Sequence, residues 1–576
     1  MKNDWLLCHE DYDADNEGVR EVLCALGNGY IVSRAAAPNA RADDKHYPGT
    51  YLSGGYNRLA TDIASQQIEN EDLVNLPNWL PLNLQMGGKD GWLHPDRTLF
   101  LDYRQVLDLR GGILTRTLRF RNDAGQVTRW EEKRIVSMDN QHVAALSVTV
   151  TPENWSGPMT LRLSIDGGVT NAGVPRYRAL NGQHLETLDR GTLKGSVLWL
   201  RSRMVQSRRE IALATRNLVE IEGDAITPTD VESSTDEVCA VYQLQAREGR
   251  PIHVEKIAAY FNSKDHAITE PLAEAVMLVR SADRMADLLH AHSRAWRQLW
   301  EQCDIQINTG NGAAQLRLRL HVFHLLQTVQ HSVGADVGVP PRGWHGESYR
   351  GHIMWDDLFI FPYSNLRMPN LSRALLLYRY RRLGVARSAA REAGLKGAMF
   401  PWQSGSNGRE ESQQIHLNPM SGRWIADVSR RQQHIGAAIC YNVWQYYEAT
   451  GDADFLVDYG AEIFFEIARF WSSLARRRKD GRYEIDGVMG PDEFHTAYPT
   501  DNPSAPTGIN NNAYTNVMVS WLMARAFDVL DRIPSAKRRR LCERLGLKDE
   551  EFDLWRDIGC NLVIPMHDDG IISQFE

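Results

Sequence analysis

Hydrophobic and polar residues alternate along much of the first 265 residues. The segments TRTLRFR (Thr115 to Arg121) and VAALSVTV (Val143 to Val150) have the two-residue period of a strand with one buried face. Turn-forming glycine, proline and asparagine stand between such segments, as in LGNGY from Leu26 and YPGTYLSGGYN from Tyr47. Short strands at close spacing predict a large N-terminal β-sandwich over residues 1–265.

The hydrophobic period becomes helical between Thr269 and Gln302. Apolar residues then recur at helical spacing with charges between them: Leu272, Val276, Val279, Leu289, Trp296 and Trp300. We interpret residues 266–305 as a helical linker between two domains.

Long amphipathic segments follow, without another strand-rich block. The pattern predicts helices at about 312–332, 370–393, 429–450, 454–477, 512–531, 535–545 and 549–557. Paired helices joined by long loops rich in glycine and aromatic residues are typical of a helical toroid, in which one end collects the loops. We therefore expect a helical catalytic domain over residues 306–576, with its site on the loops.

Composition narrows the class of protein. Of 576 residues, 43% are hydrophobic and 24% charged, and no apolar run reaches the roughly 20 residues of a membrane span. The first residues lack the basic start and apolar stretch of a secretory signal, so we expect a cytoplasmic protein without a membrane partner. A net charge of −8 argues against nucleic-acid binding. Seven scattered cysteines without CxxC spacing, and the absence of HExxH, predict neither disulfides nor a metal site.

One stretch, GWHGESYRGHIMWDD from Gly343 to Asp357, combines aromatic, histidine, arginine and carboxylate side chains without a sustained period. Aromatic faces cover the apolar faces of sugar rings, while carboxylates and guanidinium groups bond hydroxyls. The stretch therefore indicates a polyhydroxylated ligand. A loop wedged between helices is the alternative.

The loop GVMGPDEFH, Gly487 to His495, contains the most plausible acid. Gly490 and Pro491 favour a turn that presents its two carboxylates in different directions. A carboxyl against an aromatic side chain such as Phe494 would lose solvation and stay protonated near neutral pH, ready to donate to a glycosidic oxygen. On these residues alone, an acidic cap or turn is the favoured alternative.

Two further loops are rich in candidate residues. In NNNAYTN, Asn510 to Asn516, helix capping is the favoured interpretation, although amides could also line a pocket. In FPWQSGSNGREES, Phe400 to Ser412, Trp402 could stack on a sugar or anchor the loop, and the charges at 409–411 could form a surface cluster.

In their order and separation, these motifs resemble glycoside hydrolase family 65, the maltose, trehalose and kojibiose phosphorylase family. The resemblance spans nearly the whole chain, from LGNGY and LVNLPNW to GESYRGHIMWD, FPWQS, GPDEFH and NNNAYTN. It implies a multidomain fold in which an N-terminal β-sandwich (super-β-sandwich) is followed by a helical linker and an (α/α)6 barrel.

The resemblance also implies roles for individual residues. Glu493 would be the general acid, and the transferred glucosyl unit would be held by Trp355 and Asp356. Substrate binding is further expected from other residues in the same motifs: Trp402, Gln403, Arg350, His352, Asn512 and Tyr514.

The chain departs from the family pattern in two ways. Gln403 stands where the family commonly has glutamate, which replaces a negative charge beside the sugar with an amide. The chain also stops at GIISQFE, before the family's KQAD motif and phosphate-contacting residues, so we expect the barrel to be incomplete at its C-terminal side. The chain would then be a fragment, be completed by a second polypeptide, or come from an interrupted gene.

The implied reaction is inverting phosphorolysis of an α-linked glucose disaccharide to β-glucose 1-phosphate and a free sugar, with inorganic phosphate as co-substrate and no cofactor. An inverting α-glucoside hydrolase and an inactive sugar-binding fragment are the alternatives. The resemblance further leads us to expect a homodimer.

Overall fold

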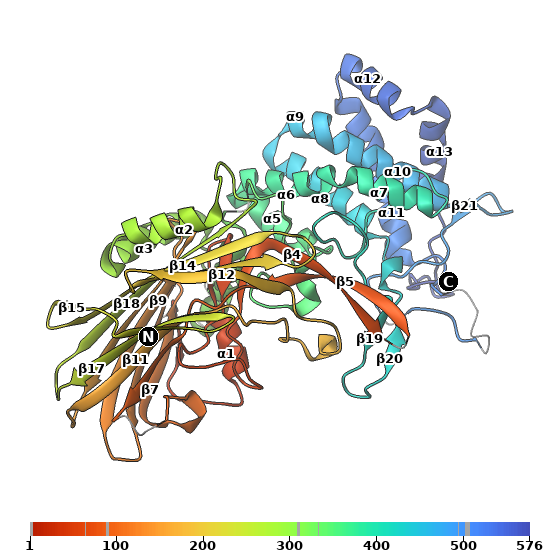
Figure 1. The fold of residues 1–576 in the computed structure, drawn as a ribbon. Helices are drawn as coiled ribbons and strands as arrows, with labels where there is room; N and C mark the ends of the chain where they lie inside the picture. Colours follow the sequence, from red (N-terminus) through yellow and green to blue (C-terminus); the bar gives the residue numbers. More distant parts are fainter. Residues whose placement is uncertain are drawn as a thin grey trace. The chain divides into compact units, whose positions relative to one another are not determined.

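The computed structural model describes residues 4–63, 65–87, 91–307, 312–331, 333–493, 495–500 and 507–576. The chain divides into two compact units. The first contains residues 1–174, 180–331 and 342–350, and the second contains residues 175–179, 332–341 and 351–576. The first is built mainly of antiparallel strands and the second mainly of helices (Figure 1).

The first unit is organised on a ten-stranded antiparallel sheet. Its strands in spatial order are β1 (Leu6–His9), β7 (Leu99–Asp108), β8 (Ile113–Arg121), β9 (Val127–Val136), β10 (Val143–Pro152), β18 (Ile252–Asn262), β14 (Glu210–Ile221), β13 (Val197–Met204) and β12 (Leu185–Leu193), with β15 (Asp224–Ile226) paired to β14. The alternation predicted for Thr115 to Arg121 is present in β8, where Leu114, Leu118 and Phe120 are buried on one face.

Two four-stranded sheets accompany the large one. One has the order β16 (Asp230–Ser233), β17 (Glu237–Ala246), β11 (Gly157–Asp166) and β6 (Leu82–Met86). The other has the order β2 (Leu26–Gly27), β3 (Ile31–Ser33), β4 (Thr50–Ile63) and β5 (Gln66–Asn75), and the short helix α1 (Glu17–Leu23) precedes it. Because β17 and β11 contact β13, the first of these sheets packs face to face on the large sheet as in a sandwich.

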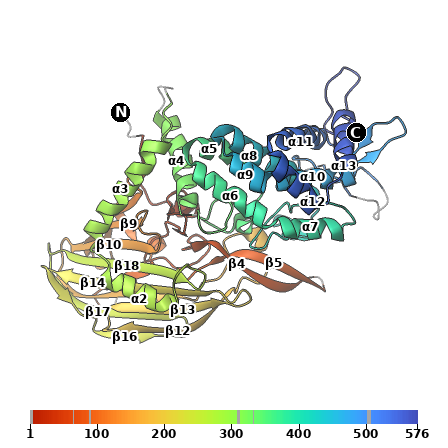
Figure 2. The same ribbon diagram turned by 90° about the horizontal axis from the view of Figure 1, so that it is seen from above.

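Helices α2 (Pro271–Ser281) and α3 (Met285–Cys303) cover the large sheet from its other face (Figure 2). Pro271 is the first residue of α2, and the Glu270 carboxylate caps the helix by accepting the Ala273 N–H. Ala275 and Val279 of α2 then pack on alanines 212, 214 and 259 of the sheet, whose small side chains admit the helix closely.

The second unit contains the remaining helices. They are α5 (Asp357–Arg367), α6 (Pro369–Arg381), α7 (Leu383–Glu392), α8 (Ile435–Thr450), α9 (Ala453–Phe455), α10 (Ala461–Leu474), α11 (Ala513–Arg532), α12 (Ser535–Leu545) and α13 (Asp549–Asn561), while α4 (Gly312–Val329) belongs to the first unit. Two short hairpins, β19 (Ile415–Leu417) with β20 (Trp424–Ala426) and β21 (Arg476–Arg477) with β22 (Tyr483–Glu484), interrupt them. Helix α8 contacts α5, α6, α10 and α11, and its sixteen residues are largely buried.

One predicted helix differs from the structure, and one observed helix was not predicted. The segment 370–393 forms two helices, because Arg382 leaves helical geometry between α6 and α7. Helix α5 was not predicted, because Pro362 lies inside it and its apolar residues surround much of its circumference. Across the part of the chain that the structure describes, we find no helix with the length and apolar content to cross a bilayer.

Lys256 of β18 lies in the interior of the sandwich. Its Nζ donates to the carbonyl oxygens of Pro81 at 2.9 Å and of Ser164 at 2.6 Å. The side chain is fully buried, and this burial lowers the pKa of the ammonium to about 7. A cation that spans two sheets in this way makes the stability of the first unit depend on pH.

Replacement of Lys256 by methionine is expected to remove that dependence. Because the folded pKa lies below the unfolded value, the unfolded chain binds more protons between about pH 7 and pH 10, and the Lys256 contribution to stability rises with pH in this window by up to about 1.4 kcal/mol per unit. Melting temperatures of the wild type, Lys256→Met and the exposed control Lys133→Met at pH 7.5 to 9.5 measure the effect. Equal pH slopes for the three proteins would contradict it.

Candidate active site

Three aromatic rings from separate segments of the second unit meet around a fourth ring, that of His434. Trp355 precedes α5, Trp402 lies in the loop after α7, His434 precedes α8 and Tyr514 lies in the first turn of α11. The centroid of the His434 ring is 4.9 Å from that of Trp355, 5.1 Å from that of Trp402 and 5.5 Å from that of Tyr514. We call these four residues the aromatic cluster. It unites Trp355, Trp402 and Tyr514, three of the predicted substrate-binding residues.

His434 is the member of the cluster that the sequence did not reveal. The residue is 1% exposed, and neither ring nitrogen has a hydrogen-bond partner among the described residues. Burial lowers its pKa to about 3, so the imidazole is neutral and has one donor and one acceptor. Buried polar atoms without partners cost stability, and the two ring nitrogens of His434 are such atoms.

The loop that carries Trp402 and Gln403 is fixed by Glu410. The Glu410 carboxylate accepts the backbone N–H groups of Trp402 at 2.7 Å, Gln403 at 3.2 Å and Ser412 at 2.9 Å. Glu410 therefore organises the loop, a role that its sequence context, between Arg409 and Glu411, did not indicate.

A short pairing joins this loop to the segment before Trp355. Backbone N–H and carbonyl groups of Ile353 and Ser404 bond reciprocally at 2.8 and 2.9 Å. In the same place, His352 Nδ1 lies 3.1 Å from the Gln403 side-chain oxygen. Two predicted substrate-binding residues, His352 and Gln403, are thus in direct contact with each other.

The candidate acid, Glu493, is connected to the same region by Gln432. The Gln432 amide donates to Glu493 Oε1 at 3.2 Å, and Gln432 stands two residues before His434. Glu493 is exposed. Phe494, which was expected to shield the carboxyl, lies outside the described residues, so that shielding stays a prediction.

The turn that carries Glu493 packs against the start of α11. A Cβ atom at Gly490 would lie 2.3 Å from the Asn512 amide nitrogen, so only glycine fits there. Asn512 itself caps α11, because its side-chain oxygen accepts the Thr515 N–H at 2.9 Å. The capping interpretation is confirmed. A cavity of about 210 Å³ adjoins this contact and is lined by residues that include Asp492, His495, Asn512 and Tyr514.

Asp356 and Asp357 are neighbours with different environments. Asp357 is buried and pairs with Arg379 at 3.0 Å. Burial raises its pKa to about 6, against the opposing charge of Arg379 and with the support of Asp356. Asp356 is half-buried at the N-terminus of α5. Asp357 therefore has a structural partner, and the sugar-binding role expected of Asp356 stays a prediction.

Arg350, another predicted substrate-binding residue, belongs to the first unit. It is 2% exposed, its guanidinium donates to Asn70 Oδ1 at 2.7 Å, and its Nε lies 3.9 Å from Asp72 Oδ1. Its expected part in substrate binding stays a prediction.

Comparison with known proteins gives the class of the chain. Residues 7–299 match the glycosyl hydrolase family 65 N-terminal domain, and residues 319–576 match the glycosyl hydrolase family 65 central catalytic domain. The chain belongs to glycoside hydrolase family 65.

Similar proteins include an uncharacterized glycosyl hydrolase of Mycobacterium tuberculosis H37Rv, 47% identical over 99% of this chain and 43% of that protein. The chain thus spans less than half the length of this relative. A trehalose 6-phosphate phosphorylase of Lactococcus lactis is 33% identical over 100% of this chain and 71% of that protein. A putative kojibiose phosphorylase from the human microbiome shares the fold, with a TM-score of 0.83 at 19% identity, over 100% of this chain and 72% of that one.

Substitution of Glu410 by glutamine is expected to loosen the loop that carries Trp402. An amide offers one acceptor oxygen where the carboxylate offers two, so at least one of the three N–H groups loses its partner, at a cost of about 1 kcal/mol. Urea denaturation and disaccharide titration calorimetry measure the loss of stability and of sugar affinity. The exposed Glu392→Gln on α7 is the matched control, and identical behaviour of both variants would contradict the role of Glu410.

His434→Phe is expected to separate stability from binding. Phenylalanine keeps the ring in the cluster but removes both unpartnered nitrogens, so the melting temperature should not fall, while disaccharide affinity should drop by roughly tenfold or more. Calorimetry and thermal melting on the same preparations give both values. Unchanged affinity would show that the His434 nitrogens do not bind the ligand.

Proposed function

We propose that the chain contributes the sugar-binding and proton-donating part of an inverting phosphorylase for α-linked glucose disaccharides. The observation that carries this proposal is the hydrogen bond from Gln432 to Glu493, which ties an exposed carboxyl to the segment that carries the buried, neutral His434. Relatives named trehalose 6-phosphate phosphorylase, kojibiose phosphorylase and α,α-trehalose phosphorylase support the reaction type.

In this proposal the aromatic cluster binds the glucosyl unit that is transferred. Trp355, Trp402 and Tyr514 cover apolar sugar faces, and the neutral His434 bonds a hydroxyl without introducing a charge. Asp356 and Gln403 add an acceptor and an amide at the edge of the cluster. Gln403 stands where the family pattern has a carboxylate. Its amide can donate a hydrogen bond to a sugar hydroxyl as well as accept one, whereas a carboxylate can only accept.

Glu493 acts as the general acid. Its proton passes to the glycosidic oxygen as the bond to the anomeric carbon breaks, and inorganic phosphate attacks that carbon from the opposite face. The products are β-glucose 1-phosphate and the released sugar. Phosphate is already an anion, so no base is needed to activate it, and one carboxyl suffices.

A hydrolase of the same family is the alternative, and it would need a second carboxylate roughly 6.5–9.5 Å from the acid to activate water. Asp492 is adjacent to Glu493 along the chain, and its Oδ2 lies 3.3 Å from His495 Nδ1. The relatives that are named phosphorylases favour the phosphorylase. The (α/α)6 barrel, the homodimer and Arg350 as a substrate ligand belong to the same proposal.

Glu493→Gln is expected to lower turnover by about 10²–10⁴-fold while disaccharide binding largely survives, because the shape remains and the proton donor is lost. The assay follows β-glucose 1-phosphate and free glucose from maltose, trehalose, kojibiose and nigerose, with and without phosphate. Asp492→Asn is the matched control and should retain most activity.

Near-normal turnover in Glu493→Gln would show that Glu493 is not the general acid. Glucose release that does not require phosphate would show that the reaction is hydrolysis and not phosphorolysis. Binding without turnover of any substrate would indicate a sugar-binding chain.

A further inference from the structure

The first unit contains a second cavity, of about 760 Å³, that the proposed reaction does not use. It is bordered by the loop 38–48, by strands β6 and β11 with their flanking segments, and by residues 168–172. Its volume is within the range of small-ligand sites, roughly 300–1,000 Å³.

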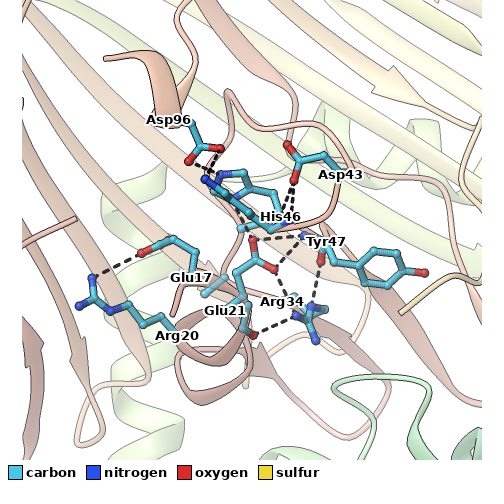
Figure 3. Close-up of polar contacts among 12 residues, drawn as sticks. Glu17, Arg20, Glu21, Arg34, Asp43, His46, Tyr47 and Asp96 are labelled. Atoms are coloured by element: carbon cyan, nitrogen blue, oxygen red, sulfur yellow. Dashed lines mark hydrogen bonds and ion pairs between the residues drawn. The ribbon is translucent and has the colours of Figure 1, made fainter. Parts of the chain in front are cut away.

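One wall of the cavity is held in place by a buried carboxylate (Figure 3). Glu21 accepts the Tyr47 N–H at 3.0 Å, pairs with Arg34 at 3.2 Å and lies 3.4 Å from His46 Nδ1. Burial lowers the pKa of His46, but the hydrogen bond and charge of Glu21, together with Asp43 and Asp96, raise it more, so the net shift is upward. The loop is therefore fixed by charge-assisted bonds before any ligand arrives.

The same wall brings Asp43, His46 and Asp96 close together, with their ligand atoms within 4.8 Å of one another. These atoms already serve the loop. Asp43 Oδ1 accepts the N–H groups of Lys45 and His46 at 2.8 and 2.7 Å, and Asp96 accepts the Tyr12 hydroxyl. The cluster thus shapes the cavity wall and does not indicate a metal ion.

The lining of the cavity also includes a tryptophan, Trp92. Trp92 is 38% exposed, and the Arg162 guanidinium lies 5.5 Å from its ring centroid. The Asn83 amide donates to the Leu93 carbonyl at 3.0 Å and fixes the segment that follows Trp92. An exposed aromatic side chain in the lining of a polar cavity is suited to the apolar face of a sugar ring.

The lining of the cavity carries charges of both signs, with one more carboxylate than guanidinium group. They come from three arginines, Arg41, Arg97 and Arg162, and four carboxylates, Asp43, Asp44, Asp166 and Glu237, beside four asparagines at 39, 75, 78 and 83. The carboxylates oppose an anionic ligand, and the arginines oppose a cationic one. Amides, carboxylates and guanidinium groups together offer donors and acceptors to a neutral, hydroxyl-rich molecule.

We infer that this cavity is a second, non-catalytic site for a neutral saccharide. Trp92 covers the apolar face of one hexose, and Asn39 with the carboxylate and arginine side chains bonds its hydroxyls. The site is independent of the reaction proposed for the second unit, because Glu493 and the aromatic cluster contribute nothing to it.

The experiment uses the full chain labelled with 5-fluorotryptophan. The resonance of Trp92 is assigned as the ¹⁹F signal that is missing from the spectrum of Trp92→Phe. Maltose, trehalose and kojibiose are then titrated to about 20 mM, which exceeds the millimolar Kd of a weak site. A saturable shift of this resonance is expected, with the same Kd in Glu493→Gln. Because Glu493→Gln lacks the proposed general acid, saccharide binding at Trp92 in this variant is measured without turnover. Failure of the second site and failure of the proposed reaction can therefore be told apart.

Calorimetry then compares alanine variants at two side chains of similar exposure, Trp92 (38% exposed) and Leu193 (42% exposed). Trp92→Ala should weaken this class of site by about tenfold or more, and Leu193→Ala should leave it unchanged. Thermal melting checks that both variants fold. The inference is overturned if the Trp92 resonance does not respond, if it responds to inorganic phosphate but to no neutral saccharide, or if both variants bind alike.

Discussion

The loops of this protein depend on carboxylates that accept several hydrogen bonds at once. Irregular backbone cannot satisfy its own N–H groups, and each one left buried without a partner costs free energy. Glu410 meets this constraint for three N–H groups around Trp402. Glu347 accepts the hydroxyls of Tyr47 and Tyr51 and the N–H of Gly173. The loops are thereby preorganised without helices or strands.

The same constraint explains why acidic residues of equal type have different roles. Burial raises the pKa of Glu347, and the hydrogen bonds from Tyr47 and Gly173 oppose that shift. The oxygens of this carboxyl are therefore already bonded to protein groups. Asp357 is likewise committed to Arg379. Glu493 is exposed, and the side-chain bond described for it comes from a neutral amide. Availability, and not residue type, distinguishes the candidate acid.

Much of the fold could be predicted from hydrophobic periods, because strands and long helices repeat one burial pattern over many residues. Strand β10 and helix α11 lie close to their predicted bounds. Helix α5 was missed because Pro362 and mixed polarity hide its period. The cap at Asn512 was predictable, since it is a local interaction. His434 was not, because a single histidine before a helix has no distinctive spacing, and its importance arises from three rings that are distant in sequence.

The stretch from Gly343 to Asp357 shows why a concentration of reactive side chains does not define a site. Its first part, through Arg350, belongs to the first unit, where Glu347 and Arg350 are buried in bonds to residues of the N-terminal sheets. Its second part belongs to the other unit, where Trp355 joins the aromatic cluster. Residue types that bond sugars well also bond loops well, since both tasks need oriented donors and acceptors. The number of hydrogen bonds that a polar group already makes to protein distinguishes a group that holds a loop from one available to a ligand. In the aromatic cluster, His434 has two ring nitrogens without a partner among the described residues.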